Sequence, residues 1–362
     1  MFWSVLFPIY VVVLLLCFNL ESPGLLGLAA SEGGGNVKDQ QALLEFKAKI
    51  SNNQLGILRL WNNTVYYCQW YGVSCGSRRQ RVTQLVLESQ HLTGSISPSI
   101  GNFSFLKVLN LKNNSFIHEI PQEIGRLRRL RIYHLAANSI GGEIPRNKWE
   151  NLTFVRERII FGETFSTFKK LVGVIPETLG QLKRLTFFSV GLNNFSGTVP
   201  SSFCNLSNIR TFDIGDNYLE GSRGANDLNF PCSLTNARML RRLSINENNF
   251  GGSTPECIGN LSTDLLHLNL DVNEISRTIP ATIGNLINLE PLTIWNNQLS
   301  RAIPSVIGRL QQLQEFKAQN NSLSEGIPSS FGDLKMLISL NLSHNNLQGS
   351  IPSSLVVPYL PK

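Results

Sequence analysis

The feature that most constrains this chain is a pattern of residues that recurs about every 24 positions. Its clearest copy, Leu337–Pro352, reads L-x-x-L-x-L-x-x-N-x-L-x-G-x-I-P. Each copy can bury its apolar side only against its neighbours, so the 362 residues are predicted to form one array of stacked units. Eleven units can be aligned, and their first apolar places are Val82, Leu106, Leu130, Phe161, Leu185, Ile209, Leu240, Leu265, Leu289, Leu313 and Leu337.

The letters of the unit predict its local structure. The L-x-x-L-x-L segment is expected to form a short strand with its apolar side chains inward, and successive strands should stack as a parallel sheet about 4.8 Å apart. Glycine and Ile-Pro at the return permit a tight turn and stop a helix or strand from continuing. Asparagine at the ninth place should turn inward and bond backbone groups that no strand partner reaches. These asparagines are Asn114, Asn138, Asn193, Asn217, Asn248, Asn273, Asn297, Asn321 and Asn345.

The first residues predict export from the cell. Phe2–Leu20 is an apolar run without a charged side chain, and small residues follow at Gly27, Ala29 and Ala30, which fits a signal peptide over residues 1–30. A signal anchor is the alternative, because the run is just long enough to span a membrane. We therefore expect the secretory pathway and an extracellular or cell-surface location.

Nine N-x-S/T sequons support this expectation, because one or two would arise by chance and N-glycosylation belongs to the secretory route. The predicted glycosylation sites are Asn62, Asn102, Asn113, Asn151, Asn194, Asn205, Asn260, Asn320 and Asn341.

The cysteines point to the same compartment. Cys68 and Cys75 are seven residues apart and are expected to form a local disulfide, which an oxidising compartment allows. The sequence leaves the pairing of Cys204, Cys232 and Cys257 open, and an unpaired member of this set is expected to be a buried thiol.

A small cap is predicted before the repeats, over residues 31–80. Asp39 can cap a helix that runs to about Ile50, with Ala42 and Phe46 on its apolar face. An array of repeats needs such a unit, because its first repeat would otherwise expose an apolar end.

Three motifs carry a resemblance to a known family. The line D-x-x-A-L-L-x-F-K at Asp39–Lys47 and the line C-x-W-x-G-V-x-C at Cys68–Cys75 resemble the N-terminal cap of plant leucine-rich-repeat receptors. An insert at Ser222–Asn236 replaces one return and resembles the D-x-x-F-x-x-S-L-T-N insert of immune-type receptor kinases, a subfamily that includes the flagellin and elongation-factor receptors and the rice blight-resistance kinase. It is matched here by Asp227, Phe230, Ser233, Leu234, Thr235 and Asn236.

The resemblance implies an α/β leucine-rich-repeat solenoid over residues 81–352, with its parallel sheet on the inner face. It also implies a peptide or protein ligand on that face and a co-receptor kinase as a possible partner. In the family, a cysteine-paired cap, a membrane span and a kinase follow the repeats. None is present here, so residues 353–362 are interpreted as a truncated tail and the chain as a truncated relative.

Two units depart from the pattern. The fourth unit is degenerate: with its start at Phe161, Ser166 stands where leucine is expected and Lys169 where asparagine is expected. It is either a specialised loop or a decayed repeat, and we favour the decayed repeat because its local pattern conflicts with its neighbours. Pro291 occupies a strand position of the ninth unit, where it should remove one hydrogen-bond donor from the sheet.

The residues offer no catalytic constellation. The five histidines lie in different units, and His134 and His267 should be five strands apart, about 24 Å at the usual sheet spacing, which excludes a shared metal or a nucleophile–base pair. Kinase and phosphate-loop motifs are absent, so we expect no enzyme activity and no cofactor. The net charge of +7 includes a dense group at Arg126–Arg131, which we interpret as solvated rather than as a nucleic-acid site.

Function is therefore expected on the outward strand positions, where charged, amide and aromatic side chains are mixed as protein recognition requires. Trp295 is either an anchor for a ligand or a shield for the sheet beside Pro291. Glycans at Asn113, Asn320 or Asn341 would block nearby parts of this face. The candidate ligand residues are Arg131, His134, Phe187, Arg210, Asp213, Asp216, Arg241, His267, Asp271, Trp295 and Lys317.

The sequence therefore predicts extracellular peptide or protein recognition in plant defence or surface signalling. One alternative is a secreted inhibitor of cell-wall-degrading enzymes, since plant inhibitors of that kind use the same repeat, although they carry a C-terminal cysteine cap. The other alternative is a non-functional fragment of a receptor gene, suggested by the broken fourth unit and the abrupt end.

Overall fold

The computed structural model describes residues 34–135, 138–145, 157–160, 171–183, 185–221 and 228–355, except for the side chains of residues 34–36 and 157–160. Gly35–Lys362 forms one compact unit. The predicted signal segment, the final residues 356–362 and the sequon at Asn151 lie outside the described residues. None of the helices in the described ranges combines the length and the apolar character that crossing a membrane needs.

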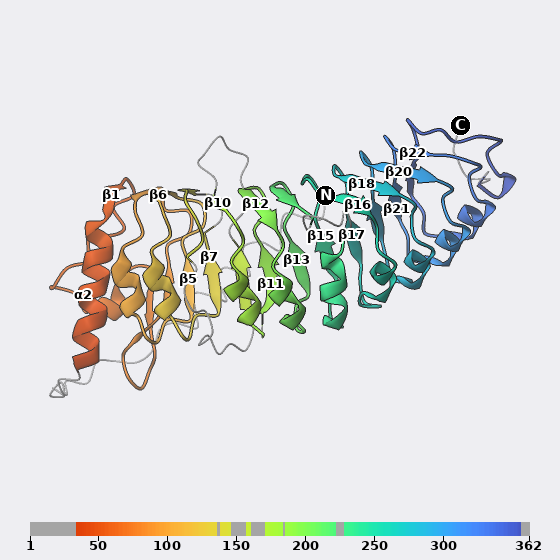
Figure 1. Ribbon diagram of the computed structural model, residues 1–362. Helices are drawn as coiled ribbons and strands as arrows, with labels where there is room; N and C mark the ends of the chain where they lie inside the picture. Colours follow the sequence, from red (N-terminus) through yellow and green to blue (C-terminus); the bar gives the residue numbers. More distant parts are fainter. Residues whose placement is uncertain are drawn as a thin grey trace, which may run out of the picture. The chain divides into compact units, whose positions relative to one another are not determined.

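Eleven parallel strands, one from each unit, stack in sequence order into a single sheet, as predicted. A twelfth strand, β2, adds to it antiparallel at the N-terminal edge. Figure 1 shows β5, β7, β11, β13, β15 and β17 following one another along the coil. The strands are β2 (Val73–Cys75), β3 (Val82–Val86), β5 (Val108–Asn110), β7 (Ile132–His134), β9 (Glu157–Ile160), β11 (Leu185–Ser189), β13 (Thr211–Asp213), β15 (Arg242–Ser244), β17 (His267–Asn269), β19 (Pro291–Thr293), β21 (Glu315–Lys317) and β23 (Ser339–Asn341).

The asparagine ladder predicted at the ninth place is present in all nine units that carry the residue. Asn217 shows its pattern: its Oδ1 accepts the Phe195 N–H at 3.0 Å, and its Nδ2 donates to the carbonyls of Val190, Ile214 and Gly215 at 3.0–3.1 Å. Two of these four partners belong to the preceding unit. The amide therefore satisfies backbone groups left over where each strand ends and ties each unit to its neighbour.

A second strand in most units builds three smaller sheets beside the main one, which we call the lateral sheets. The first holds β1 (Ile50–Asn53), β4 (Leu92–Gly94), β6 (Ser115–His118) and β8 (Ser139–Ile140). The second holds β10 (Val172–Gly173), β12 (Asn194–Thr198) and β14 (Tyr218–Glu220). The third holds β16 (Gly251–Ser253), β18 (Glu274–Arg277), β20 (Gln298–Arg301) and β22 (Ser322–Leu323).

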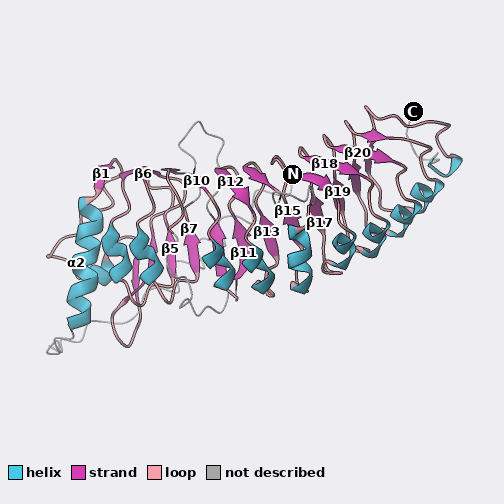
Figure 2. Ribbon diagram, viewed as in Figure 1, coloured by secondary structure: helices cyan, strands magenta, loops and turns pink. Residues whose placement is uncertain are grey.

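Short 3-10 helices complete each turn, and Figure 2 shows them in a row along the coil. Most begin directly after the proline of the Ile-Pro pair, which stands at the N-cap with extended backbone angles. The proline thus ends the lateral strand and starts the helical turn. They are η2 (Pro98–Asn102), η3 (Gln122–Arg126), η5 (Glu177–Gln181), η6 (Ser201–Asn205), η7 (Phe230–Asn236), η8 (Glu256–Asn260), η9 (Ala281–Asn285), η10 (Ser305–Arg309), η11 (Ser329–Asp333) and η12 (Ser353–Leu355).

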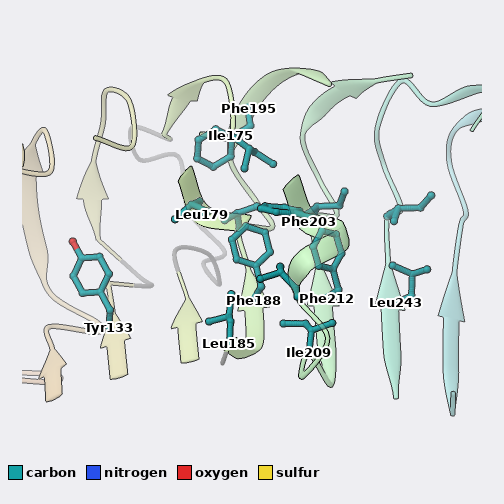
Figure 3. Packing of buried hydrophobic residues seen from close by; sticks show 14 of the residues in the cluster. Tyr133, Ile175, Leu179, Leu185, Phe188, Phe195, Phe203, Ile209, Phe212 and Leu243 are labelled. Atoms are coloured by element: carbon teal, nitrogen blue, oxygen red, sulfur yellow. The ribbon is translucent and has the colours of Figure 1, made fainter. Parts of the chain in front are cut away.

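The core is a continuous apolar column between the strands and the helical turns. Around the insert it is aromatic: the ring centroids of Phe188, Phe203 and Phe212 lie 5.2–5.5 Å apart (Figure 3), and Phe230 of the insert stacks 5.2 Å from Phe250. These rings supply buried apolar area beside the insert.

A disulfide between Cys232 and Cys257 joins η7 to η8 and resolves the pairing that the sequence left open. Cys204 stays free, but it is exposed, so the expectation of a buried thiol was wrong. Cys68 and Cys75 are bonded as predicted.

The cap helix, α2 (Gly34–Ala48), begins five residues before Asp39, so the prediction that Asp39 caps it was wrong. Asp39 is instead fully buried and accepts two bonds from the Arg81 guanidinium, at 2.7 and 2.9 Å, and a third from the Val82 N–H at 2.8 Å. A buried carboxylate is tolerated only when it is paired in this way. Asp39 thus bonds the cap to the first strand of the array.

The fourth unit differs from its predicted register. Ile159 of β9 pairs with Tyr133 and with Phe188, which both hold the fourth place of their units, whereas a start at Phe161 would put that place at Thr164. The strand therefore lies five residues earlier than predicted, although β10 keeps the predicted phase. Ile159 follows Tyr133 by 26 residues and precedes Phe188 by 29, so two residues beyond the usual step of 24 lie before the strand and five lie after it. Ser166 and Lys169 lie outside the described residues.

Pro291 removes one donor from the sheet, as expected. In a neighbouring unit, the Arg241 carbonyl accepts hydrogen bonds from two N–H groups, those of Leu266 and His267. At the equivalent place beside Pro291, the Leu266 carbonyl accepts only the Glu290 N–H, at 2.8 Å. The strand still forms, so the loss is local.

We predict that Asn217→Ala lowers the free energy of unfolding by about 2–3 kcal/mol, because it leaves buried backbone groups of two units without partners. Urea unfolding followed by circular dichroism measures this. Asn246→Ala is the matched control, because Asn246 points outward and should cost less than about 1 kcal/mol. Equal losses in the two variants would contradict the role given to the ladder.

Candidate ligand-binding face

The strand face, defined as the solvent side of the main sheet, is formed by residues that the fold does not require. In and directly after β15, Leu243 and Ile245 are buried, whereas the alternate residues Arg242, Ser244 and Asn246 point outward. The same alternation recurs in most of the units whose side chains the structure describes. Since only the inward places stabilise the array, the outward places are available for recognition.

Hydrogen bonds between outward side chains link the fifth to seventh units and, separately, the eighth and ninth units. The Ser189 hydroxyl donates to Asp213 at 2.9 Å, and the Asn246 amide donates to Asp216 at 3.3 Å. Between the eighth and ninth units, the Thr293 hydroxyl donates to Asn269 at 2.6 Å. These bonds join neighbouring strands across the surface and hold the side chains in fixed positions.

Three carboxyl groups of this network influence one another. Burial raises the pKa of Asp271 to about 6, while hydrogen bonds from Trp295 and Thr293 oppose the shift and the charges of Glu247 and Asp216 add to it. Asp271 is only 6% exposed, less than expected for an outward residue, because it lies among these neighbours. Its charge is therefore poorly hydrated, and a cation that approached it would gain more than one at an exposed carboxylate.

Asp213 behaves in the same way in the sixth unit. Burial raises its pKa, bonds from Ser189 and the Gly215 N–H lower it, and Asp216 and Arg242 act in opposite directions. The interactions place Asp213, Asp216 and Asp271 in one acidic group that also includes Glu247.

Basic residues border this group. Burial and the charge of Arg242 lower the pKa of His267, while Glu290 raises it, so His267 is more readily neutral than an exposed histidine. Arg210 and Arg241 lie on neighbouring strands, where the Arg241 N–H bonds the Arg210 carbonyl at 2.8 Å.

A pocket of about 310 Å³ opens at the edge of the strand face where the strands of the fifth to eighth units end. It holds two carboxylates, from Asp216 and Glu247, beside the 58% exposed ring of Tyr218. This mixture of charge, amide and aromatic surface suits a side chain of a peptide or protein better than a purely apolar ligand. Its lining residues are Asn193, Asp216, Asn217, Tyr218, Glu247, Asn248, Asn249 and Val272.

The structure brings together only some of the candidate residues. Asp213, Asp216, Asp271 and Trp295 belong to the linked group, with His267 at its border. Lys317 lies in the tenth unit and is paired with Glu315. The remaining candidates lie outside the acidic group: Arg131 is exposed and His134 half-buried in the third unit, and Phe187 is half-buried in the fifth.

Two residues that line the pocket, Tyr218 and Glu247, were not among the candidate ligand residues. The strand pattern did place Glu247 outward, because it holds the eighth place of its unit, as Asp216 does. Tyr218 follows the ninth-place asparagine, a position that the strand pattern does not include.

The basic group at Arg126–Arg131 is not only solvated. The guanidinium of Arg129 lies 4.1 Å from the centre of the Phe105 ring, and Arg79 and Arg81 approach the same ring at 5.6 and 4.9 Å. Such contacts are favourable when a cation lies over an aromatic face. They hold part of the basic group against the start of the array.

Most of the predicted glycosylation sites that the structure describes lie on or near the surface. Asn102, Asn205 and Asn260 are exposed on the 3-10 helices, and Asn113 and Asn320 are exposed at the eighth place of their units. The remaining described sites, Asn62, Asn194 and Asn341, are half-buried. The strand face of the sixth to ninth units carries no sequon.

Among the described residues, no group of three or more His, Cys, Asp and Glu side chains is arranged to hold a metal ion.

The raised pKa of Asp271 predicts a pH-dependent stability. Unfolding returns this carboxyl to its ordinary pKa, so the folded state binds the proton more tightly, and the free energy of unfolding should fall by roughly 1–3 kcal/mol as the pH rises from about 4 to about 7. Asp271→Asn should remove this contribution, which urea unfolding at several pH values measures.

The control for this experiment is Asp264→Asn, at an exposed aspartate outside the strand face. It should keep the pH dependence of the parent protein. If Asp271→Asn kept it as well, the assignment to Asp271 would be wrong.

Three family models match the chain. The model described as "Leucine-rich repeat region" matches residues 84–301, "Leucine rich repeat N-terminal domain" matches residues 37–76, and "Leucine rich repeat" matches residues 287–347. Together they cover the cap and nearly all of the repeats.

Curated relatives are plant receptors. The LRR receptor-like serine/threonine-protein kinase EFR of Arabidopsis thaliana is 56% identical over 97 residues, which covers 26% of this chain and 9% of the relative. The receptor-like protein EIX1 of Solanum lycopersicum is 30% identical over 298 residues, or 75% of this chain and 28% of the relative. The chain thus matches only a minor part of the length of these relatives.

Solved structures show the same architecture. The Arabidopsis receptor kinase HAESA, in complex with the peptide hormone IDA and the co-receptor SERK1, has a TM-score of 0.71 at 26% identity, covering 88% of this chain and 51% of that one. A TDR receptor gives a TM-score of 0.60 at 27% identity, covering 72% and 47%. The solenoid fold, its repeats and its relatives agree: this chain belongs to the leucine-rich-repeat family, and its relatives are plant receptor-like kinases and receptor-like proteins.

Proposed function

We propose that this chain recognises a peptide or protein ligand on its strand face, as part of the extracellular region of a plant receptor of the immune type. The observation that carries the proposal is the linked polar group of the fifth to ninth units, with Trp295 and Tyr218 beside it. None of these outward side chains is needed to stack the units, and aromatic anchors beside half-buried polar groups are typical of binding hot spots.

The charge of this group suggests the chemistry of the ligand. Asp213, Asp216, Glu247 and Asp271 give the middle of the face an excess of negative charge, although the chain as a whole carries +7. A lysine or arginine side chain of a ligand would enter the pocket at Asp216 and Glu247 and stack against Tyr218. We therefore expect a ligand with at least one basic residue.

The relatives support a role in recognition. The HAESA structure holds a peptide hormone and a co-receptor, so a peptide ligand and a co-receptor kinase are the partners we propose for this chain. The insert that ends at Asn236 and the 56% identity to EFR over 97 residues support the immune-type subfamily. Plant defence and a cell-surface location belong to the same proposal.

The pattern of sequons supports the choice of face. Glycans at Asn102, Asn205 and Asn260 would cover the helical side, and those at Asn113 and Asn320 would flank the strand face. The sixth to ninth units would remain open between them. The same stretch carries the acidic group.

Selection from a displayed random-peptide library on the purified, glycosylated chain tests the proposal. Enriched peptides should carry lysine or arginine, and the double variant Asp216→Asn/Glu247→Gln should weaken their binding about tenfold or more, because it removes both charges from the pocket. Isothermal titration calorimetry measures the affinities.

The matched control is Asp264→Asn/Asp333→Asn, which removes the same charge from two exposed positions away from the strand face. It should bind the selected peptides as the parent protein does. Equal weakening in both double variants would show that net charge, and not the pocket, governs binding.

A glycan placed on the strand face gives a second test. Gln298→Thr creates an N-x-T sequon that begins at Asn296, and this exposed residue holds the eighth place with φ 56°, as the natural sequon residues Asn113 and Asn320 do with φ 53° and 54°. The added glycan should lie beside Trp295 and abolish binding of the selected peptides.

Gln298→Val is the control, since valine has nearly the shape of threonine but creates no sequon. A mass shift in the threonine variant confirms the glycan, and enzymatic deglycosylation should restore binding. Full binding by the glycosylated variant would place the ligand elsewhere.

A further inference from the structure

The thirteenth place of most units has a left-handed backbone, and two adjacent units fill it with arginine instead of glycine. Gly142, Gly173, Gly197 and Gly252 hold this place with φ between 75° and 85°, as the x-G-x-I-P pattern predicts. Arg277 at the end of β18 and Arg301 at the end of β20 hold it with φ 67° and 66°. His118 and Glu325, with φ 67° and 65°, are the other side chains found there among the described units.

At two of the glycines a side chain would meet the preceding unit, whereas a Cβ on Gly349 would meet nothing within 4 Å. A Cβ on Gly142 would lie 2.4 Å from the Glu119 side chain, and one on Gly173 would lie 2.8 Å from that of Glu143. Both glutamates hold the fourteenth place of the preceding unit. Where the thirteenth place carries a side chain, the fourteenth place of the preceding unit holds a small residue. These pairs are Ser95 before His118, Ser253 before Arg277, Thr278 before Arg301 and Ala302 before Glu325.

Neither arginine side chain makes a hydrogen bond or an ion pair that would stabilise the described part of the fold. A left-handed backbone is unfavourable for a residue with a Cβ and costs glycine almost nothing. Arg277 and Arg301 are exposed, hold equivalent places on neighbouring strands and carry like charges. Within the described ranges neither guanidinium has an ion-pair partner. Strain that a simple substitution would relieve is a feature of functional sites.

We propose that Arg277 and Arg301 form a docking site for an acidic segment of a protein partner, on the third lateral sheet. Guanidinium groups on two adjacent lateral strands offer several donors to carboxylates, which favours Asp or Glu side chains. The site goes beyond the proposed function, because this sheet is separate from the strand face.

The surroundings favour a protein over a uniformly anionic polymer. Glu274, on the same strand as Arg277, and Glu325, at the equivalent place after Arg301, are both exposed. A polymer with a negative charge on every unit would be repelled by them. A protein can instead present two carboxylates to the arginines and a cation to Glu325, which gives selectivity as well as attraction.

The test uses the full chain and a fluorescent synthetic peptide with two aspartates and one lysine in a Gly-Ser background. Fluorescence anisotropy measures its affinity, and thermal unfolding measures Tm. Arg277→Gly/Arg301→Gly should weaken peptide binding about fivefold or more and at the same time raise Tm by about 2–4 °C, because strain is relieved. A purely structural role for the arginines would lower Tm.

His118→Gly is the matched control, since His118 holds the same place with φ 67° on the first lateral sheet, so the variant relieves the same strain but leaves both arginines and Glu325. It should raise Tm and leave the affinity within about twofold. Asp216→Asn/Glu247→Gln should not change binding of this peptide, which separates this site from the strand face.

Four results would overturn the proposal. They are a fall in Tm on replacing the arginines, no binding of the peptide up to about 1 mM, an equal loss of affinity in His118→Gly, and equal binding of an oligouronide with the same net charge. The last result would assign the arginines to an anionic polysaccharide instead.

Discussion

The structure depends on one inward-facing amide in nine of its eleven units. Where a strand ends, the chain must turn away from the sheet, and several carbonyls and N–H groups lose their strand partners. The ninth-place asparagine replaces those partners, and it does so for its own unit and the preceding one. Leaving such groups unpaired costs more free energy than most single contacts contribute. The amide therefore fixes the position at which the chain turns in each unit that carries it. The apolar residues can then vary among Leu, Ile, Val, Phe and Tyr without loss of register.

Because the inward residues stabilise the array, the outward residues can be specialised for binding. The inward leucines and the asparagine set the position of the backbone, so the outward residues of the strand face can be exchanged at little cost in stability. The chain uses this freedom in the fifth to ninth units, where Ser189, Asp213 and Asp216 form bonds that serve no stacking function. The burial of Asp271 beside Trp295 is unfavourable for stability, since a carboxylate is more stable when water can hydrate it.

Much of the fold could be predicted because its information is local. Eleven strands and nine ladder asparagines follow from a pattern that repeats within 24 residues. The errors concern contacts between distant residues. Asp39 looked like a helix cap, and only its distance to Arg81 shows a buried ion pair. The fourth strand was misplaced because its apolar residues fit two registers, and pairing with Tyr133 decides between them.

The functional surface was predictable only in outline. The strand pattern placed Asp213, Asp216, Asp271 and Trp295 outward, but which of them interact depends on side-chain direction across neighbouring units. The pairing of Cys232 with Cys257 could not be inferred either, since the insert brings their units together by a path that the repeat does not encode. The thirteenth-place arginines were visible as breaks in the glycine pattern. Only the backbone angles show that these arginines occupy a left-handed position that favours glycine.

The lateral sheets have a mechanical consequence. The main sheet is continuous from β2 to β23, whereas the lateral strands are divided into three groups, joined only by single bridges at Gly142–Leu171 and Glu220–Asn249 among the residues that the structure describes. An array that is hydrogen-bonded continuously on one side, but is interrupted at two points on the other side, bends most easily at those two points. The chain should therefore flex as three rods with two hinges. A ligand long enough to cross a hinge would select an angle between rods as well as a set of side chains.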